Sequence, residues 1–379
     1  MQLSSKTSYA PLEGIVAVEF AGIGPGPFCA MLLADLGARV IRVDRPISNG
    51  KAIAVERLAQ ARSDVLGRSK WSIALDLKSA DSRSIAEALL TRADVLIEGY
   101  RPGVMERLGY GPEDVLALNP AIIYARMTGW GQTGPLSSLA GHDLNYISLS
   151  GVLSMIGPAG GPPSIPLNLI GDFGGGGMYM AYAIAAALGA RGEGRRGVVI
   201  DAAMSEGASI LAAMIFGMWS SGNWVERRGS NLLDGGAPFY SIYRCADGGY
   251  IGVAALEPQF YSELLARLGL GDDAAFADQY NRETWVDMRV GFEAVFGSRP
   301  RAYFEGILAD CDACSFPVLS PQEALDHPHN LARESFVDVG GVVQPAPGPL
   351  FDGARPSIPR PAPFVDEHRR EVLDFIGFD

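Results

Sequence analysis

Short apolar runs rich in β-branched residues alternate with helical patterns through the first half of the chain. The apolar runs predict strands at residues 15–20, 39–43, 95–97, 122–127 and 198–200. Helical patterns cover residues 28–36, 79–91 and 112–118, and more apolar helical patterns lie at 143–155, 175–188 and 205–219. Strands that alternate with helices in this way form parallel βαβ units. The pattern therefore predicts an α/β domain of the Rossmann-like type with a parallel sheet.

A polar stretch over residues 220–236, rich in Gly, Ser, Asn and Arg, precedes a different pattern. Apolar alternation on both sides of Asp247-Gly248-Gly249 indicates a β-hairpin, and helical patterns follow at 259–268, 285–296 and 302–308. Seven prolines between residues 345 and 363 predict an extended path before a last helix at 367–375. We therefore expect a large Rossmann-like domain over residues 1–221, a small α+β domain over 222–330, and a C-terminal segment, 331–379, that returns to the large domain.

Charge and cysteine content exclude several classes of protein. The 379 residues carry a formal net charge of −12, which disfavours a general attraction to nucleic acid or to an anionic membrane. An uncharged run at 173–190 has the length of a membrane span, but its glycines and alanines favour a buried helix. Cys311 and Cys314 have C-x-x-C spacing without a second ligand pair, so we expect buried thiols, with a metal or redox site as the alternative. The absence of an apolar N-terminal signal segment leads us to expect a cytoplasmic protein.

The loop after the first predicted strand imitates a dinucleotide-binding fingerprint. Its glycines, within residues 22–26, run G-x-G-x-G and not G-x-G-x-x-G. Pro25 and Pro27 also remove two backbone N–H groups that a pyrophosphate would need, which disfavours NAD or FAD. Arg42 and Arg45 lie at the end of the second predicted strand, where a guanidinium could bind a phosphate. Solvated surface arginines are the alternative interpretation.

Three side chains are candidates for acid–base chemistry. His142 opens a predicted helix, and the positive end of a helix favours the neutral imidazole that can accept a proton. Asp172 precedes four consecutive glycines and a predicted helix, so that it could be a catalyst or an N-cap. Glu257 precedes a third predicted helix, where the helix dipole alone would favour an acid. For His142 too, helix capping is the alternative.

Ordered sequence blocks across the chain resemble one enzyme family. The blocks PLEGI (11–15), GPGPFCA (24–30), LGARV (36–40) and VDRP (43–46) resemble the N-terminal signature of the family III CoA transferase superfamily. Other blocks are similar to its α-methylacyl-CoA racemase branch: LDLK (75–78), RPGVM (101–105), YAR (124–126), GHDLNY (141–146), LNL (167–169), GDFGGG (171–176), LDGGAPFY (233–240) and EPQFY (257–261). The resemblance extends from about Leu12 to Phe378.

The resemblance implies an isomerase that acts on acyl-CoA thioesters of branched-chain lipid metabolism. In this branch the positions of His142 and Asp172 carry two catalytic bases, and that of Glu257 carries a carboxylate held close to the histidine. Such an enzyme interconverts (R)- and (S)-2-methylacyl-CoA thioesters by 1,1-proton transfer through an enolate. We expect the backbone N–H groups of residues 174–177 to bind the enolate oxygen. The alternative is a family III acyl-CoA:carboxylate CoA transferase that uses Asp172 as its nucleophile.

The resemblance also implies how the substrate is bound and how the subunits assemble. The implied CoA contacts are Arg45, Leu75, Asp76, Leu77, Lys78, Gly141, Asp143, Leu144, Asn145 and Tyr146, with Arg42, Arg101 and Arg126 as further candidates. No cofactor is implied beyond the CoA thioester substrate, and the expected assembly is an interlocked homodimer with active sites between the large domain of one subunit and the small domain of the other. Residues 46–71 match the family poorly, so adenine contacts there are not assigned, and the acyl preference is not assigned either. Four methionines could form either an acyl surface or core: Met178, Met180, Met204 and Met218.

Overall fold

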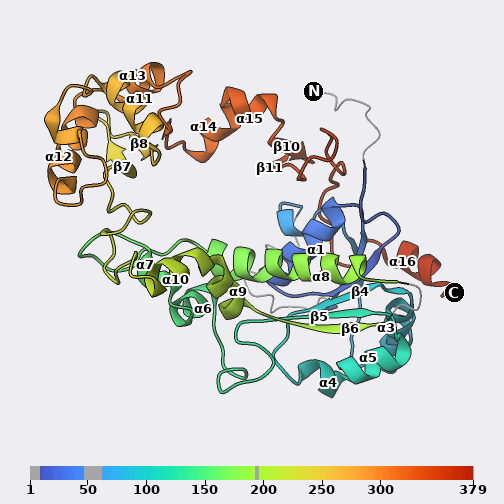
Figure 1. Ribbon diagram of the computed structural model, residues 1–379. Helices are drawn as coiled ribbons and strands as arrows, with labels where there is room; N and C mark the ends of the chain where they lie inside the picture. Colours follow the sequence, from blue (N-terminus) through green and yellow to red (C-terminus); the bar gives the residue numbers. More distant parts are fainter. Residues whose placement is uncertain (1–8, 47–61, 193–195, 379) are drawn as a thin grey trace. The chain divides into compact units, whose positions relative to one another are not determined.

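A computed structural model describes residues 9–46, 62–192 and 196–378 of the chain (Figure 1). The chain divides into two compact units: unit 1 is Met1–Ser150, Leu167–Leu211 and His329–Asp379, and unit 2 is Gly151–Pro166 and Ala212–Pro328. The predicted boundaries are 221/222 and 330/331, with residues 151–166 in the large domain. Those residues join unit 2 because the Arg228 guanidinium donates hydrogen bonds to the carbonyl oxygens of Ser154 and Gly161.

Unit 1 contains a six-stranded parallel sheet with the order β3-β2-β1-β4-β5-β6. The predicted α/β class with a parallel sheet is therefore confirmed. The chain builds outward from β1 to β3 and then returns to place β4 beside β1, so the strand order reverses between β1 and β4. The strands are β1 (Val16–Phe20), β2 (Arg39–Asp44), β3 (Trp71–Ala74), β4 (Val95–Glu98), β5 (Ile123–Thr128) and β6 (Val198–Ala203). Of these, β3 was not predicted.

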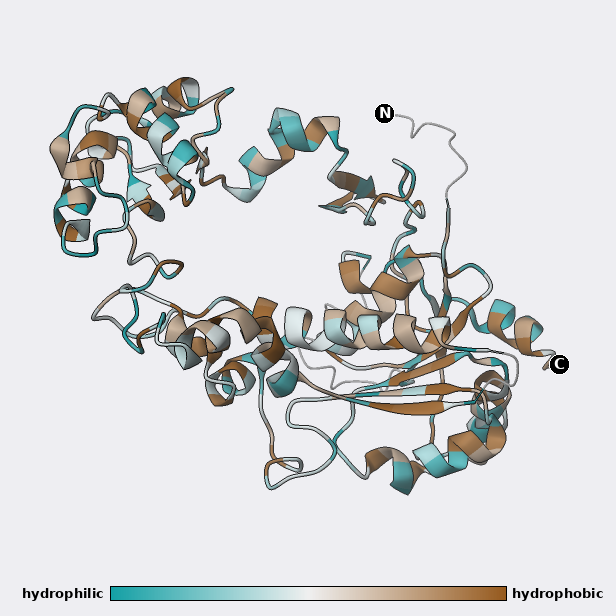
Figure 2. Ribbon diagram, in the orientation of Figure 1, coloured by the Kyte–Doolittle hydropathy of each residue, from teal (hydrophilic) through white to brown (hydrophobic). Residues whose placement is uncertain are grey.

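Helices cover both faces of this sheet (Figure 1). On β1, Ala17 packs into the cluster that includes α1 (Pro25–Asp35) and α8 (Tyr179–Gly189), whereas Val18 packs into the cluster on the opposite face. The helices of that opposite face are α3 (Ala80–Arg92), α4 (Val104–Leu108), α5 (Pro112–Leu118) and α16 (Arg369–Ile376). Both faces of the sheet carry mainly apolar side chains, in agreement with the largely brown colour of the strands in Figure 2.

Three apolar helices predicted after β5 differ from those in the structure. The one expected at 143–155 is divided into α6 (Asp143–Leu149) and α7 (Val152–Met155), because Gly151 takes a left-handed conformation with φ of +80°. The one expected at 205–219 is divided into α9 (Met204–Leu211) and α10 (Ala213–Ser220). The one expected at 175–188 begins earlier, because a π-helix, η2 (Leu169–Met178), precedes α8.

The glycine run of η2 packs against the backbones of α9 and α1. A Cβ on Gly207 of α9 would lie 1.8 Å from the carbonyl oxygen of Gly175, and a Cβ on Gly177 would lie 2.7 Å from that of Pro25. Both distances are too short for real side chains, so glycine is what allows these backbones to touch. Gly175 and Gly177 are therefore used in packing between helices.

Unit 2 has an antiparallel sheet of β7 (Tyr240–Arg244), β8 (Tyr250–Ala254) and β9 (Ser315–Pro317), with the order β7-β8-β9. The first two strands form the predicted hairpin. The helices of the unit are α11 (Pro258–Leu268), η3 (Ala274–Phe276), α12 (Trp285–Gly297), α13 (Arg301–Ile307) and α14 (Pro321–Asp326), besides α7 and α10. Its core is aromatic: Phe239, Tyr243, Phe276, Phe292, Phe296 and Phe304.

The remaining elements are η1 (Val65–Gly67), α15 (Pro328–Ala332) and the strand pair β10 (Phe336–Val339) and β11 (Val342–Pro345). Across the three described stretches, none of the helices combines the length and apolar character needed to cross a bilayer. The uncharged run at 173–190 forms most of η2 and then α8, in which Met180 and Ile184 are buried. The cytoplasmic location stays a prediction.

Replacing Gly207 with alanine should destabilise unit 1, because the new methyl group would collide with the backbone of η2. We expect the Gly207→Ala variant to lose about 1–3 kcal/mol in its free energy of unfolding, measured by urea denaturation. Gly189, the last residue of α8, has open space where a Cβ would lie and serves as the control. Gly189→Ala should keep or raise stability by up to about 1 kcal/mol, and equal losses in both variants would contradict the packing argument.

Candidate active site

A cavity of about 1080 Å³ lies at the carboxyl ends of strands β1, β2, β4 and β5 of unit 1. It contains the place between β1 and β4 where the strand order reverses, which is the usual ligand site of such sheets. The structure brings together here seven of the predicted site residues: Arg42, Arg45, Arg101, Gly141, His142, Tyr146 and Asp172.

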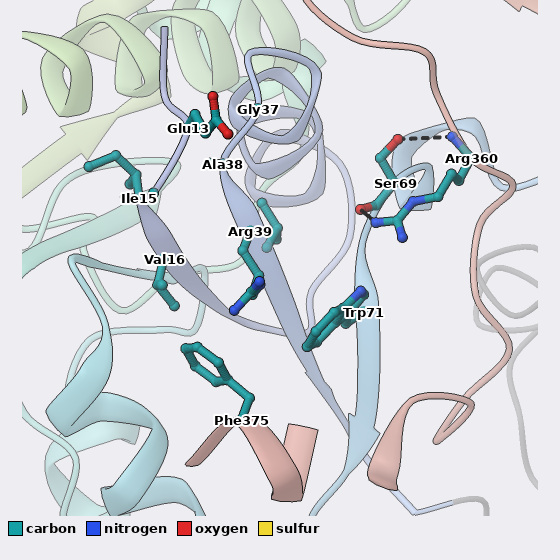
Figure 3. Close-up of a pocket in the computed structure, with 12 residues that line it drawn as sticks. Glu13, Ile15, Val16, Gly37, Ala38, Arg39, Ser69, Trp71, Arg360 and Phe375 are labelled. Carbon is teal, nitrogen blue, oxygen red and sulfur yellow. Dashed lines mark hydrogen bonds between the residues drawn. The ribbon is translucent and has the colours of Figure 1, made fainter. Parts of the chain in front are cut away.

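A smaller hollow of about 420 Å³ lies at the opposite, amino ends of β1 to β3 (Figure 3). The guanidinium carbon of Arg39 lies 4.8 Å from the ring centroid of Trp71 and 4.7 Å from that of Phe375. Arg39 is thus already used in packing between two aromatic rings. None of the predicted catalytic side chains lines this hollow, so the larger cavity is the candidate active site.

Asp172 lies within the π-helix η2 and points to the turn that connects β1 to α1. A Cβ on Gly24 of that turn would be 3.4 Å from Oδ2 of Asp172, and Asn168 donates a hydrogen bond to the same oxygen at 3.3 Å. Asp172 is not the N-cap of a helix, so that alternative is wrong. Burial raises the pKa of its carboxyl group and the charge of Asp143 adds to the increase, although the Asn168 hydrogen bond and His142 act in the opposite direction.

His142 occupies the N-cap position of α6, but its imidazole makes no capping hydrogen bond. Its backbone N–H donates to Oδ1 of Asn145 at 3.1 Å, and the residue is exposed at the cavity. One turn further along α6, the Tyr146 hydroxyl donates to the carbonyl oxygen of Gly141, and the Tyr146 ring meets that of Trp130 edge to face, with centroids 4.8 Å apart. Burial and the charge of Asp172 raise the pKa of Tyr146 to about 12, so its hydroxyl stays protonated.

The backbone amides expected to bind an enolate oxygen are not available for that purpose. Residues 174–177 lie inside η2, where each N–H donates to the carbonyl oxygen five residues earlier. At the start of this helix, the N–H groups of Gly171 and Asp172 donate to the carboxylate of Asp143. The prediction that residues 174–177 form the oxyanion site is therefore wrong.

The other residues assigned to CoA fall into two groups, those that line the cavity and those that do not. Arg45 and Arg101 are exposed at the cavity, and the Arg45 guanidinium lies 5.9 Å from the ring centroid of Tyr100. Leu75 is buried in the core, whereas Asp76 and Lys78 are exposed beyond the end of β3. The cavity wall does not include Leu75, Asp76, Leu77, Lys78, Asp143, Leu144 or Asn145.

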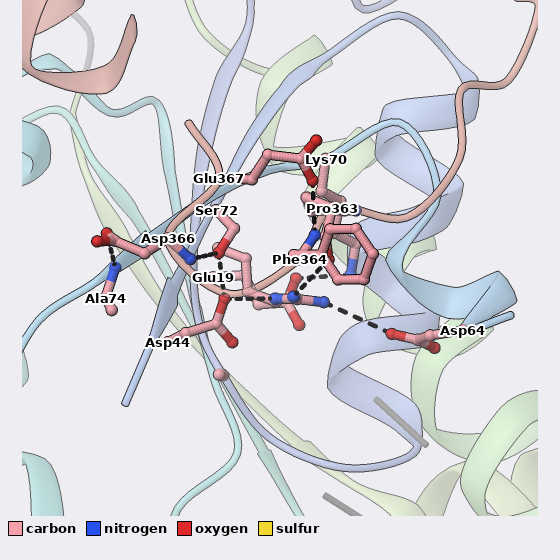
Figure 4. A network of polar contacts seen from close by, with 12 residues as sticks. Glu19, Asp44, Asp64, Lys70, Ser72, Ala74, Pro363, Phe364, Asp366 and Glu367 are labelled. Carbon is pink, nitrogen blue, oxygen red and sulfur yellow. Dashed lines mark hydrogen bonds and ion pairs between the residues drawn. The ribbon is translucent and has the colours of Figure 1, made fainter. Parts of the chain in front are cut away.

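Arg42 is at the cavity wall, but its guanidinium is committed to protein groups (Figure 4). Its Nε donates to Oδ2 of Asp44 at 2.9 Å, and its Nη1 pairs with Oδ2 of Asp64 at 3.5 Å. The Ser72 hydroxyl donates to Asp44 and accepts the backbone N–H of Asp366, which connects the pair to the C-terminal segment. Arg42 thus has a structural role, and Arg126 is likewise paired with two carboxylates, Glu98 and Glu106.

Glu257 belongs to unit 2, where it is exposed at the N-cap position of α11. Its side chain makes no capping hydrogen bond there, and its predicted contact with His142 stays a prediction.

Of the four methionines, Met204 lines the cavity, Met180 is in the core, Met178 is exposed, and Met218 lies in unit 2. Among the residues that the structure describes, no group of His, Cys, Asp and Glu side chains could hold a metal ion. The poorly matching stretch 46–71 lies partly outside the described residues, at 47–61.

Comparison with known proteins decides the family. Residues 12–369 match the sequence model of CoA-transferase family III, which covers almost the whole chain. The chain belongs to CoA-transferase family III. This membership confirms the resemblance.

Several members of the family are similar to the chain over nearly its full length. The human and mouse proteins named alpha-methylacyl-CoA racemase are each 45% identical over 370 residues, which is 97% of this chain and 94% and 93% of theirs. A crystal structure of a CAIB/BAIF family protein from Brucella suis has a TM-score of 0.82, with 26% identity, and covers 97% of this chain and 100% of its own.

Sequence reasoning missed the residue that contacts the Asp172 carboxylate. Asn168 is the N-cap residue of η2 and lies four residues before Asp172, a spacing that brings two side chains to the same side of a helical segment. The predicted helix begins after Asp172, whereas η2 begins at Leu169 and includes it. The role of Asp143 was also missed, because a carboxylate that accepts N–H groups 28 and 29 residues away leaves no local pattern.

The two cavity arginines at the end of β2 should respond differently to substitution. Arg42→Ala would leave Asp44 and Asp64 without their buried cation, so we expect the free energy of unfolding to fall by about 3–5 kcal/mol. Arg45→Ala should change it by no more than about 0.5 kcal/mol, because Arg45 is exposed. Urea denaturation of both variants measures the difference, and a stable Arg42→Ala protein would contradict the structural role.

Proposed function

We propose that this protein is a racemase that interconverts (R)- and (S)-2-methylacyl-CoA thioesters. The observation that carries this proposal is that His142 and Asp172, two side chains able to exchange protons, line one cavity in a member of CoA-transferase family III. The 45% identity to proteins named alpha-methylacyl-CoA racemase supports the same choice within the family.

The chemistry requires two groups that together hold one transferable proton. The hydrogen on the carbon next to a thioester is weakly acidic, so a base can remove it to leave a planar enolate. With His142 neutral and Asp172 protonated, the imidazole takes the proton of one epimer and the carboxyl group returns its own to the opposite face. With His142 cationic and Asp172 ionised, the same steps run in reverse from the other epimer. Glu257 is proposed to stabilise the imidazolium.

The environment of Asp172 fits this exchange of roles. A carboxyl group with an ordinary pKa would be almost fully ionised at neutral pH and would seldom have a proton to give. Burial and the Asp143 charge raise the pKa of Asp172, which brings its protonated form closer to the working pH. The hydrogen bond from Asn168 favours the ionised form, so both protonation states receive support.

The CoA portion of the substrate carries several phosphate charges, whereas the protein has a net charge of −12. Attraction must therefore come from individual cations placed at the cavity. Arg45 and Arg101 are exposed there, and we assign them to the phosphates. Lys78 is exposed after β3, outside the cavity wall, and is a further candidate only because the resemblance implies it. Arg42 is excluded from this set because its guanidinium is paired with Asp44 and Asp64.

We further propose that the protein is a homodimer. Helix α8, with the sequence YMAYAIAAALG, has no charged residue, yet its Tyr182 side chain is 71% exposed. Large apolar side chains are also exposed on the neighbouring elements of unit 1: Leu149 of α6, Leu169 of η2, and Ile210 and Leu211 of α9. An apolar surface of this kind supports burial against a second copy of the chain.

Solvent exchange tests the proposed reaction. Each epimer of a 2-methylacyl-CoA thioester, incubated with the protein in heavy water, should acquire deuterium at the α-carbon as it is converted to the other. His142→Ala and Asp172→Ala should each slow α-proton removal about 10²–10⁴-fold, and from opposite epimers. Mass spectrometry of the recovered thioesters measures both. If both variants affected the same epimer only, the two-base scheme would be wrong.

The transferase alternative gives a different outcome in a parallel experiment. A CoA transferase would form a covalent aspartyl thioester on Asp172 when incubated with an acyl-CoA donor, and hydroxylamine would then inactivate it. We expect no inactivation of the wild-type protein. Inactivation that is lost in Asp172→Ala would replace the racemase proposal with the transferase.

The homodimer makes a separate prediction. Sedimentation equilibrium should give twice the 40.2 kDa chain mass, and Tyr182→Glu should shift the equilibrium to the monomer because a buried charge on α8 would lack a partner. Leu118→Glu, on α5 at the other face of the sheet, is the matched control and should leave the dimer intact. A wild-type monomer would contradict the assembly.

A further inference from the structure

Asp143 joins the two segments that carry His142 and Asp172. It is the first residue of α6, directly after His142, and it is only 5% exposed. Its Oδ2 accepts the backbone N–H of Gly171 at 2.6 Å and that of Asp172 itself at 2.7 Å. The carboxylate therefore satisfies two N–H groups at the start of η2, which would otherwise have no helical acceptor.

The local sequence of η2 is adapted to this contact. A Cβ on Gly171 would lie 2.7 Å from Oδ2 of Asp143, so a larger residue at position 171 would push the carboxylate away. The hydrogen bond to Oδ2 of Asp143 also holds the peptide group of Asp172 next to Asp143, the residue that directly follows His142. No other described side chain hydrogen-bonds to the backbone N–H groups of both Gly171 and Asp172.

We propose that Asp143 is a positioning residue that sets Asp172 relative to His142 by holding the first turn of η2 through two backbone hydrogen bonds. This inference rests on the proposed function, since it assigns to Asp143 a part in the same proton transfer. It also replaces the role implied by the resemblance, in which Asp143 contacts CoA, because its carboxylate faces η2.

The negative charge of Asp143 gives the contact a second effect. Its Oδ1 is buried and has no hydrogen-bond partner among the described residues, so the charge acts on its neighbours with little screening. The titratable groups that bear on Asp172 are His142, Asp143 and Tyr146 from α6, while Asn168 of the preceding turn supplies a hydrogen bond. The parts of α1 and α9 near η2 present Pro25, Phe28 and Met204, which do not titrate.

Two substitutions separate the hydrogen bonds from the charge. Asp143→Asn keeps an oxygen acceptor and removes the charge, whereas Asp143→Ala removes both. In Asp143→Ala, the amide hydrogens of residues 171 and 172 should lose protection from hydrogen exchange, and α-deuterium incorporation should fall about tenfold or more from both epimers, mainly in kcat. In Asp143→Asn, amide protection should be retained.

The pH dependence of α-deuterium exchange distinguishes the proposed role of Asp143 from a role in folding stability alone, which would not shift it. Without the Asp143 charge, the pKa of Asp172 should fall, so the acid limb of α-deuterium exchange from the epimer that uses Asp172 as base should move to lower pH in Asp143→Asn. Asn168→Ala should move that limb to higher pH, because the ionised carboxylate loses a donor. Asp114→Asn alters a carboxylate that accepts a backbone N–H at the remote helix α5. This variant is the matched control and should not shift the acid limb.

Some results would overturn the inference. Wild-type exchange rates and amide protection in Asp143→Ala would do so, and so would an unshifted acid limb in Asp143→Asn. If Asp143→Ala does not fold, the pH profile of Asp143→Asn decides alone. A wild-type protein that exchanges no α-proton would instead overturn the proposed function, while the amide measurements would still test whether Asp143 holds η2.

Discussion

Direct contact between the backbones of η2, α9 and α1 is the constraint on which the candidate site depends. Gly175 and Gly207 allow a π-helix and an α-helix to touch without intervening side chains, and Gly177 does the same against the start of α1. A π-helix has poorer hydrogen-bond geometry than an α-helix, so tertiary packing has to stabilise it. This packing places Asp172 beside Gly24, in the turn between β1 and α1, where the cavity lies.

The sheet determines where such a cavity can form, and the loops determine what it can bind. Strand order reverses between β1 and β4, which separates the loops that follow these strands and leaves room between them. In a dinucleotide-binding protein, the N–H groups at the start of the first helix would face a pyrophosphate. Here two prolines occupy that start, and the turn instead faces a carboxyl group from η2. The same architecture thus presents a carboxyl group at a position where dinucleotide-binding proteins bind phosphate.

Strand periodicity predicted most of the sheet, because its buried parallel strands consist mainly of apolar residues, although they also carry buried charged residues such as Glu19, Arg42 and Arg126. The four-residue strand β3 was missed, since it contains Ser72, whose hydroxyl is satisfied by Asp44 and by the distant backbone N–H of Asp366. The π-helix was missed for a similar reason. Its glycines were interpreted as a helix start whose N–H groups face the substrate, whereas they contact α9 and α1. These contacts are distant in the sequence, so the local pattern of residues does not reveal them.

Residue types and the family resemblance predicted several of the residues that line the candidate site. They did not predict the role of a residue whose charge is paired with groups far away in the sequence. Arg42 and Arg45 are three residues apart, and both fit a phosphate equally well in the sequence. Asp64 and the C-terminal segment convert Arg42 into a structural cation, whereas Arg45 stays exposed at the cavity. In a protein of net charge −12, each cation paired internally is lost to an anionic substrate. Binding of a polyphosphate therefore depends on the few arginines and lysines that folding leaves exposed, and these can be identified only once the ion pairs of the fold are known.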